Sequence, residues 1–169
     1  MKFRMITKTE VNDFWELRLH GLKEHPELFS GSYEEFVAHP LGEVMESFPV
    51  ENNHFVLGAF DENNQLVGIA GFRQETGVKL MHKGSVWGVY VSPEAQGGGI
   101  GKRLISALLD TIRQQLPELE QVHLRVVSQN EKAKRLYESF GFQTYGIERQ
   151  SLKVNTAHYV DEELMVLMF

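Results

Sequence analysis

The sequence predicts an α/β protein in which helices flank a mixed β-sheet of about six to seven strands. Three observations support this fold class: short apolar segments of strand length, one long apolar stripe of helical spacing, and the order strand, helix, strand over residues 86–127. That order is typical of a parallel crossover unit, which is right-handed in nearly all known cases. A hairpin expected in the N-terminal half adds antiparallel strands and makes the predicted sheet mixed.

Length and composition set the class of protein. The chain has 169 residues, of which 42% are hydrophobic and 24% charged, so we expect a single domain over residues 1–169 with one continuous core. No apolar run approaches the roughly 18 to 20 residues that span a bilayer, and residues 1–14 lack the core of a signal peptide. The absence of cysteine excludes disulfides, thiolate zinc sites and cysteine nucleophiles. We therefore expect a cytoplasmic protein with no membrane partner.

Acidic residues dominate residues 24–72, which hold nine acidic and no basic side chains, whereas residues 73–169 hold eleven acidic and twelve basic ones. Two explanations stay open: glutamates that cover the solvated faces of two helices, or an electrostatic bias towards a cationic substrate. With a formal charge of −6, the chain lacks the basic footprint on which nucleic-acid affinity rests. We therefore expect no nucleic-acid partner.

Local patterns place the elements of the N-terminal half. Residues 3–6 suit a first strand, and apolar side chains near helical spacing predict a helix over about residues 10–24. A short helical region is expected after Ser32. Residues 54–60 and 66–72 are apolar and flank a segment rich in turn formers, which indicates an antiparallel hairpin.

The C-terminal half contains the more regular patterns. Residues 86–91 are apolar on both faces, as in a central strand, and the helical stripe that follows stops before Pro117. Asn130 is placed to cap a further helix, which Gly141 ends. The elements expected here are strands over residues 86–91, 122–127, 143–153 and 159–169 and helices over 100–116 and 131–140. The apolar tail, residues 164–169, suits a core strand better than a pairing edge.

The loop Gln96-Gly97-Gly98-Gly99-Ile100-Gly101 lies between the expected central strand and the amphipathic helix. The amides in the first turn of a helix have no partner within it, and glycines let an anion approach the main chain, so a diphosphate is the expected ligand. Lys102 and Arg103 stand at the positive end of the helix dipole, a conflict that a bound phosphate would relieve. The loop fails the patterns of P-loop and dinucleotide-binding proteins, which disfavours a kinase or a dehydrogenase. A tight strand-to-helix turn is the alternative.

These residues resemble the GNAT acetyltransferase superfamily, whose signature Gln/Arg-x-x-Gly-x-Gly/Ala occurs here as Gln96-x-x-Gly99-x-Gly101. The resemblance extends through Val89–Pro93 and through Asn130–Phe142, which is similar to the second motif of the family, and it covers about residues 86–145. It implies a GNAT-like fold in which two parallel central strands splay apart, with acetyl-coenzyme A (acetyl-CoA) wedged between them.

The resemblance also implies roles for individual residues. Main-chain groups of Val89 and Val91 would hold the pantetheine arm, and Gly88 would suit a bulge in the same strand. Asn130 would either cap its helix only or contact the arm as well. The residues placed at the cofactor in this way are Val89, Tyr90, Val91, Gln96, Gly97, Gly98, Gly99, Ile100, Gly101, Lys102, Asn130, Ala133 and Tyr137.

The implied reaction is direct attack of an amine on the acetyl thioester through a tetrahedral intermediate. Tyr137 matches the family tyrosine that protonates the departing thiolate, and with a free pKa near 10 it stays protonated at neutral pH. The alternative is a core tyrosine on an apolar helix face. A main-chain N–H on the splayed strand could stabilise the oxyanion.

The general base is left unassigned. Family members often use a glutamate on the first splayed strand, but Ser85–Ser92 contains no acid. The candidates by residue type alone are Glu148, His123, His158, Asp161, His82 and His20. The seven histidines lack paired spacing, so no metal site is expected.

The leading hypothesis is therefore an acetyl-CoA-dependent N-acetyltransferase that acts on a small amine or peptide amine. We expect the acceptor pocket to come from residues 10–48 and about 155–158, whose acidic bias favours a cationic acceptor. The alternatives are a non-catalytic module that senses coenzyme A and an enzyme that transfers a longer acyl group. A homodimer is left open.

Overall fold

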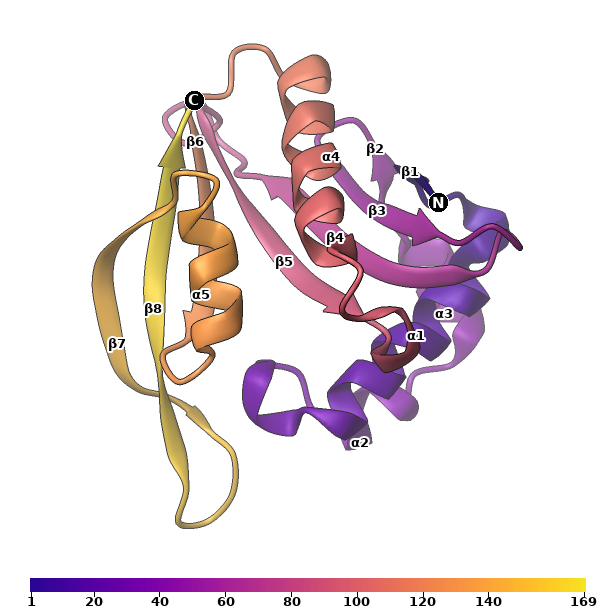
Figure 1. Ribbon diagram of the computed structural model, residues 1–169, viewed down its shortest axis with the longest axis horizontal. Helices are drawn as coiled ribbons and strands as arrows, with labels where there is room; N and C mark the ends of the chain where they lie inside the picture. Colours follow the sequence, from indigo (N-terminus) through magenta and orange to yellow (C-terminus); the bar gives the residue numbers. More distant parts are fainter.

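The computed structural model describes residues 1–169 and contains one eight-stranded sheet (Figure 1). Seven strands follow the order β1-β3-β4-β5-β6-β8-β7, and β2 pairs with β3. The strands are β1 (Lys2–Met5), β2 (Val50–Glu51), β3 (His54–Phe60), β4 (Leu66–Gln74), β5 (Lys83–Val91), β6 (Gln121–Val127), β7 (Gln143–Lys153) and β8 (Tyr159–Met168). The helices are α1 (Val11–Glu24), α2 (Tyr33–Val37), α3 (Leu41–Ser47), α4 (Ile100–Gln115) and α5 (Glu131–Glu138), with 3₁₀ turns η1 (Lys8–Glu10), η2 (Pro26–Leu28) and η3 (Pro93–Ala95). No helix combines the length and the apolar content needed to cross a membrane.

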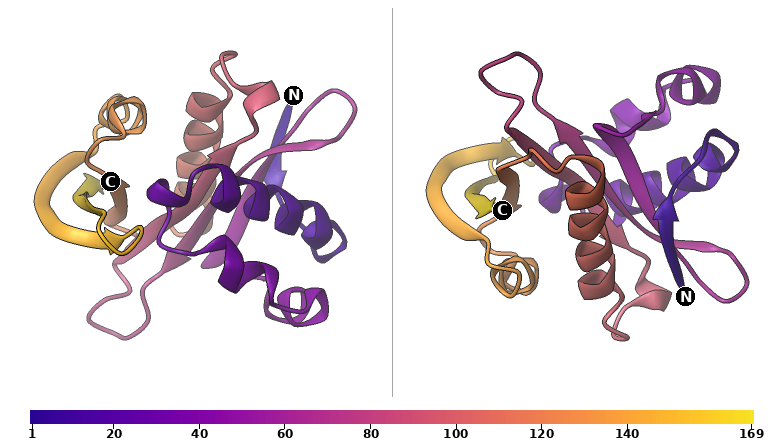
Figure 2. Two further views of the ribbon diagram at one scale, coloured as in Figure 1. Left: turned by 90° about the horizontal axis from the view of Figure 1, so that it is seen from below. Right: turned by 90° about the horizontal axis from the view of Figure 1, so that it is seen from above.

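The helices lie on both faces of the sheet, with α1, α2 and α3 on one side and α4 and α5 on the other (Figure 2). Each side has its own hydrophobic core. The larger core lies under α4 and α5 and contains the buried stripe of α4, from Ile100 through Leu104 and Leu108 to Ile112. The smaller core lies under α1 and joins Val11 and Phe14 to the inner face of β3, β4 and β5.

Strands β5 and β6 pair over only a short stretch and then splay apart. Their parallel pairs are Lys83–Gln121, Gly84–Val122 and Ser85–His123, and none follows. On the other side of β5, Ile69 pairs with Tyr90 and Gly71 with Trp87, so a β-bulge of two residues faces Ala70 alone. Gly88 lies in this bulge with φ +62°, a left-handed conformation that favours glycine. The splay and the bulge together open the centre of the sheet.

The structure confirms the mixed α/β sheet, the crossover unit and the bulge at Gly88. The strand count is higher than the predicted six to seven because the two-residue β2 joins the sheet, and α3 adds a helix that the irregular pattern of residues 41–47 did not indicate. The apolar tail forms β8 between β6 and β7, so it is an interior strand, as favoured. β5 begins at Lys83, before the expected start at residue 86, because only its last part is apolar on both faces.

An ion pair fixes β1 to the start of α1. Arg4 Nη1 and Nη2 donate to the two carboxylate oxygens of Glu10 at 2.9 and 2.5 Å, and the Thr7 amide donates to the same carboxylate at 3.0 Å. The hydrogen bond from Arg4 is the largest cause that lowers the pKa of Glu10 to about 2, against opposing desolvation. Because the folded pKa lies below the reference value of 4.5, this stabilisation is present above pH 4.5 and is lost as the pH falls through about 2.

We therefore expect Glu10→Gln to lower the free energy of unfolding at pH 7 by about 1 kcal/mol, a value reduced for solvent screening at a partly exposed pair. The difference from the wild type should shrink as the pH falls from 4.5 towards 2, as measured by urea unfolding. Glu46→Gln removes the same charge at an exposed residue without a polar partner and should change stability little. A loss that is the same at every pH would contradict this assignment.

Candidate active site

The glycine loop presents a row of free amides at the start of α4. The first backbone bond of this helix runs from the Arg103 amide to the Gly99 carbonyl at 3.1 Å, and the amides from Gly97 to Lys102 donate to no acceptor in the chain. Gly99 caps the helix with φ +69°, and a Cβ added at Gly97, Gly98 or Gly99 would meet no atom within 4 Å. A helix start with open space and unsatisfied donors suits an anion.

Gln96 joins this loop to its neighbours. Its side-chain Nε2 donates to the Val91 carbonyl at 3.0 Å, and its Oε1 accepts from Lys132 Nζ at 3.2 Å. Asn130 Oδ1 accepts from the Ala133 amide at 3.1 Å and so caps α5, as expected. These bonds hold the end of β5, the glycine loop and the start of α5 together around the mouth of the gap.

The main chain of β5 presents polar groups to the gap itself. The Ser92 amide donates to the carbonyl of Val67 in β4, so the alternate residues Val89 and Val91 direct their N–H and C=O groups away from β4. The side chains of both valines pack on the larger core, whereas Tyr90 packs on the smaller core and its hydroxyl lies 2.8 Å from His20 Nδ1. Val89 and Val91 are therefore suited to bind an extended ligand through the main chain, and the Tyr90 side chain lies on the other face.

Tyr137 lies on α5 and is only 7% exposed, within the larger core and edge-on to Phe142. Burial raises the pKa of Tyr137 to about 12, so the phenol is protonated at neutral pH. Its hydroxyl has no hydrogen-bond partner in the chain and is not one of the fully enclosed polar atoms. The ring is thus a core residue while the hydroxyl stays available as a donor.

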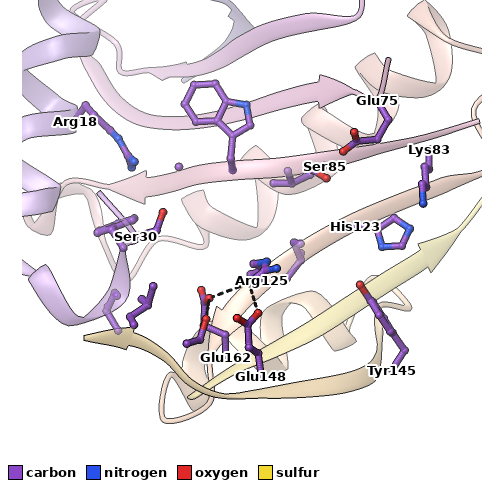
Figure 3. A pocket seen from close by; sticks show the side chains of 18 of the residues that line it. Arg18, Ser30, Glu75, Lys83, Ser85, His123, Arg125, Tyr145, Glu148 and Glu162 are labelled. Atoms are coloured by element: carbon purple, nitrogen blue, oxygen red, sulfur yellow. Dashed lines mark hydrogen bonds and ion pairs between the residues drawn. The ribbon is translucent and has the colours of Figure 1, made fainter. Parts of the chain in front are cut away.

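A cavity of about 740 Å³ opens on the opposite face of the sheet, where β5 and β6 diverge (Figure 3). Its lining includes Arg18 of α1, residues 28–30, β5 from Lys83 to Gly88, and parts of β6, β7 and β8. A second cavity of about 490 Å³ shares Phe29, Ser30, Ser151 and Leu152 with the first. The gap between β5 and β6 therefore connects the face of the sheet that carries the glycine loop with a cleft under α1 on the other face.

Three charged residues form a cluster on one wall of the larger cavity. Arg125 Nη1 lies 2.5 Å from Glu148 Oε2 and 3.5 Å from Glu162 Oε2. Ser151 Oγ also donates to Glu162 Oε2, at 2.5 Å, while Glu162 Oε1 has no partner. Glu162 is 7% exposed, so this wall carries a buried carboxylate with one free oxygen.

Strand pairing places Glu162 beside Val127 of β6, at the open end of the splay. If the pairing of Lys83 with Gln121 continued along both strands, Val89 would lie level with Val127, and Val127 pairs with Glu162. His123, by contrast, pairs with Ser85 at the closed end of the splay. Sequence reasoning did not single out Glu162, because its nearness to the centre depends on β8 returning beside β6.

Two of the base candidates named from the sequence line this cavity: Glu148 and His123. Desolvation and nearby positive charge lower the pKa of His123, which keeps its ring neutral at pH 7. The other candidates lie elsewhere, and of these Asp161 pairs with Arg149 and His20 with Tyr90. Residues 155–158 line neither of these two cavities, so the expected contribution of this loop to the acceptor pocket stays a prediction. Of the acidic residues between 24 and 72, only Glu34 reaches a cavity, the smaller one.

Comparison with known proteins agrees with this architecture. The family model described as "Acetyltransferase (GNAT) family" matches residues 22–142. An N-alpha-acetyltransferase RimI of Mycobacterium tuberculosis is 38% identical over 106 residues, which are 63% of this chain and 62% of that protein. The chain thus matches less than two thirds of this relative's length.

Solved structures agree over nearly the whole chain. A GNAT-family acetyltransferase from Streptococcus pneumoniae superposes with a TM-score of 0.84 at 16% identity over 99% of both chains. The structure of yncA, a putative acetyltransferase of Salmonella typhimurium with its cofactor acetyl-CoA, gives 0.79 at 22% identity over 99% of this chain and 93% of that one.

The architecture is that of an acetyltransferase. It combines a mixed sheet with two splayed parallel strands, free amides at the start of the following helix and a cleft across the splay. The chain belongs to the GNAT acetyltransferase family, since the family model matches most of its length. The resemblance seen in the sequence and the expected fold are thereby confirmed, and acetyl-CoA is the cosubstrate that this family uses.

Proposed function

We propose that residues 1–169 act as one catalytic domain that transfers the acetyl group of acetyl-CoA to a primary amine. The observation that carries this proposal is the open splay between β5 and β6, with free amides at one end of it and a polar cleft on the far face. Acetyl-CoA supplies an acetyl thioester that an amine can attack.

The residues present fit the parts of acetyl-CoA. The free amides from Gly97 to Lys102 would bind the diphosphate, and the absence of side chains at Gly97, Gly98 and Gly99 leaves room for it. Val89 and Val91 would bind the pantetheine arm through the main chain, and Asn130 and Ala133 begin the helix on the other side of the arm. Ile100 and Gly101 contribute main-chain donors, and Lys102 adds positive charge at the same helix end.

The chemistry requires one proton to leave the amine and one to reach the sulfur. The nitrogen attacks the carbonyl carbon, a tetrahedral intermediate forms, and the carbon–sulfur bond then breaks. Tyr137 would give its proton to the departing sulfur, as a phenol that stays protonated at neutral pH can do. Glu162 would take a proton from the amine, directly or through one water, because it lines the cavity across the splay and keeps one carboxylate oxygen without a partner.

We expect Glu162→Gln to lower kcat at pH 7 by roughly 10- to 50-fold and to leave the affinity for acetyl-CoA nearly unchanged. The defect should shrink towards pH 10, because bulk water deprotonates more of the amine there. Glu163→Gln makes the same change one residue along β8, on a residue that pairs with Lys134, and should retain kcat. A defect of Glu162→Gln that is constant over this pH range would contradict the role of a base.

The test of the proposed function is thiol release from acetyl-CoA with a panel of amines, with mass spectrometry of the acetylated product. We expect release above the rate without an amine for at least one acceptor. Binding of acetyl-CoA without transfer to any acceptor would instead support the alternative, a module that senses coenzyme A.

The oligomeric state stays open, and two expectations stay predictions: a cytoplasmic location and a cationic acceptor. The cavity lining gives the last of these little support. Its charged side chains are balanced, with Arg18, Lys83 and Arg125 against Glu75, Glu148 and Glu162.

A further inference from the structure

Arg18 occupies a position on the buried face of α1 where the pattern of that helix calls for an apolar residue. It lies between Phe14 and Leu22 on this face and is 8% exposed. Its guanidinium makes no hydrogen bond or ion pair in the chain and only faces the rings of Phe29, at 5.0 Å, and Phe36, at 5.8 Å. A buried cation without an anion destabilises a fold, so its retention here calls for an explanation.

The guanidinium points towards β5 (Figure 3). Arg18 Nη1 lies 3.2 Å from the place where a Cβ on Gly88 would stand, which puts the charge beside the bulge of β5. Its nitrogens are not fully enclosed, and Arg18 lines the larger cavity. The guanidinium therefore offers N–H donors to this cavity.

Nothing else in the cavity neutralises this charge. Arg125 engages Glu148 and Glu162 on the other wall. Ser30 lines the same end of the cavity, and its hydroxyl also has no partner. Desolvation lowers the pKa of Arg18 to about 10, so the side chain still carries its charge at neutral pH.

We infer that Arg18, with Ser30, binds a carboxylate on the amine acceptor, so that the acceptors are amines with a carboxylate close to the nitrogen, as in free α-amino acids. The inference rests on the proposed function and names its substrate class. The carboxylate and the amine of the acceptor must lie close together because Arg18 lies at the bulge itself. A carboxylate bound there keeps a neighbouring amine beside the bulge, where the thioester would lie. The carboxylate of Glu162 on the opposite wall suits the positive end of such a zwitterion.

The experiment compares the twenty standard L-amino acids with their decarboxylated amines and with spermidine, using thiol release and calorimetric binding to the protein saturated with desulfo-CoA. We expect transfer to one or more amino acids and at least a tenfold lower kcat/KM for the matching decarboxylated amine. In Arg18→Met, the KM and the Kd for the preferred amino acid should rise about 10- to 100-fold, because a charge-assisted bidentate contact is lost. In the same variant, the KM and Kd for the decarboxylated amine and the Kd for desulfo-CoA should change less than threefold. Arg18→Lys should recover part of the affinity for the amino acid.

Stability separates binding from a structural role. Arg18→Met should have a Tm equal to or above that of the wild type, because it removes an uncompensated buried charge. Arg113→Met, which removes an exposed guanidinium from the ring of Phe169, is the matched control and should leave every constant unchanged.

Three results would overturn the inference: preference for amines without a carboxylate, an equal loss in Arg18→Met for both acceptor classes, or a lower Tm of that variant. If no amine is acetylated, the proposed function fails. The calorimetric titration with amino acids still tests the inference in that case. Binding that requires the carboxylate and is lost in Arg18→Met would support a carboxylate site at Arg18. Equal binding of the decarboxylated amines would refute it.

Discussion

Tyr137→Phe is expected to lower kcat by about 10²-fold or more, which corresponds to about 2.7 kcal/mol of transition-state stabilisation. The substitution removes one oxygen that has no partner in the chain and leaves the packing of the ring on Phe142 in place. Thiol release under saturating acetyl-CoA and acceptor measures kcat, and calorimetry measures the affinity for the cofactor. We expect that affinity to change little.

Tyr159→Phe provides the control for this experiment. Tyr159 is 42% exposed and lines neither cavity, so loss of its hydroxyl should not alter kcat. Tyr137→Phe should also keep the stability of the wild type, because no hydrogen bond is lost. An unchanged kcat in Tyr137→Phe would remove this residue from the role of general acid and return it to the core.

Gly99→Glu is expected to abolish the binding of acetyl-CoA, with a loss of affinity of more than about 10²-fold. The glutamate would place bulk and negative charge where free amides face the diphosphate. It would also strain a backbone at φ +69°. Calorimetry with desulfo-CoA measures the affinity, and circular dichroism verifies the fold.

A second variant separates charge from strain. Gly98 is not in a left-handed conformation and has open space around it, so Gly98→Glu adds the charge without the strain and should lose affinity to a similar extent. Gly42→Glu makes the same change in α3, away from the loop, and should bind as the wild type does. Wild-type affinity in a folded Gly98→Glu would show that this loop does not bind the diphosphate.

Local sequence patterns predicted those parts of the fold that depend on local physics. The bounds of β3 and β7 agree with the expected segments. The apolar stripe of α4 and its glycine-rich start could be located because helix periodicity and helix capping depend on residues that are close in the sequence. The bulge at Gly88 was likewise indicated by a glycine inside an apolar strand.

The acceptor side could not be predicted in this way, because it is assembled from residues that are far apart in the sequence. Glu162 reaches the centre through the return of β8 beside β6, and a bulge between Glu148 and Leu152 of β7 is fixed where the Gln150 amide donates to Asp161. Arg18 belongs to no motif, and its burial without a partner is seen only in the structure. A buried charge in an amphipathic stripe was the one sequence signal that could have indicated it.

Calorimetry on the wild-type chain measures whether the free amides after β5 bind the diphosphate of coenzyme A. Titration with desulfo-CoA should show saturable binding at one site, and pantetheine, which lacks the diphosphate together with the 3′-phosphoadenosine, should bind at least 10²-fold more weakly. Absence of heat and of any thermal shift with desulfo-CoA, or equal affinity for pantetheine, would show that these amides do not bind the diphosphate.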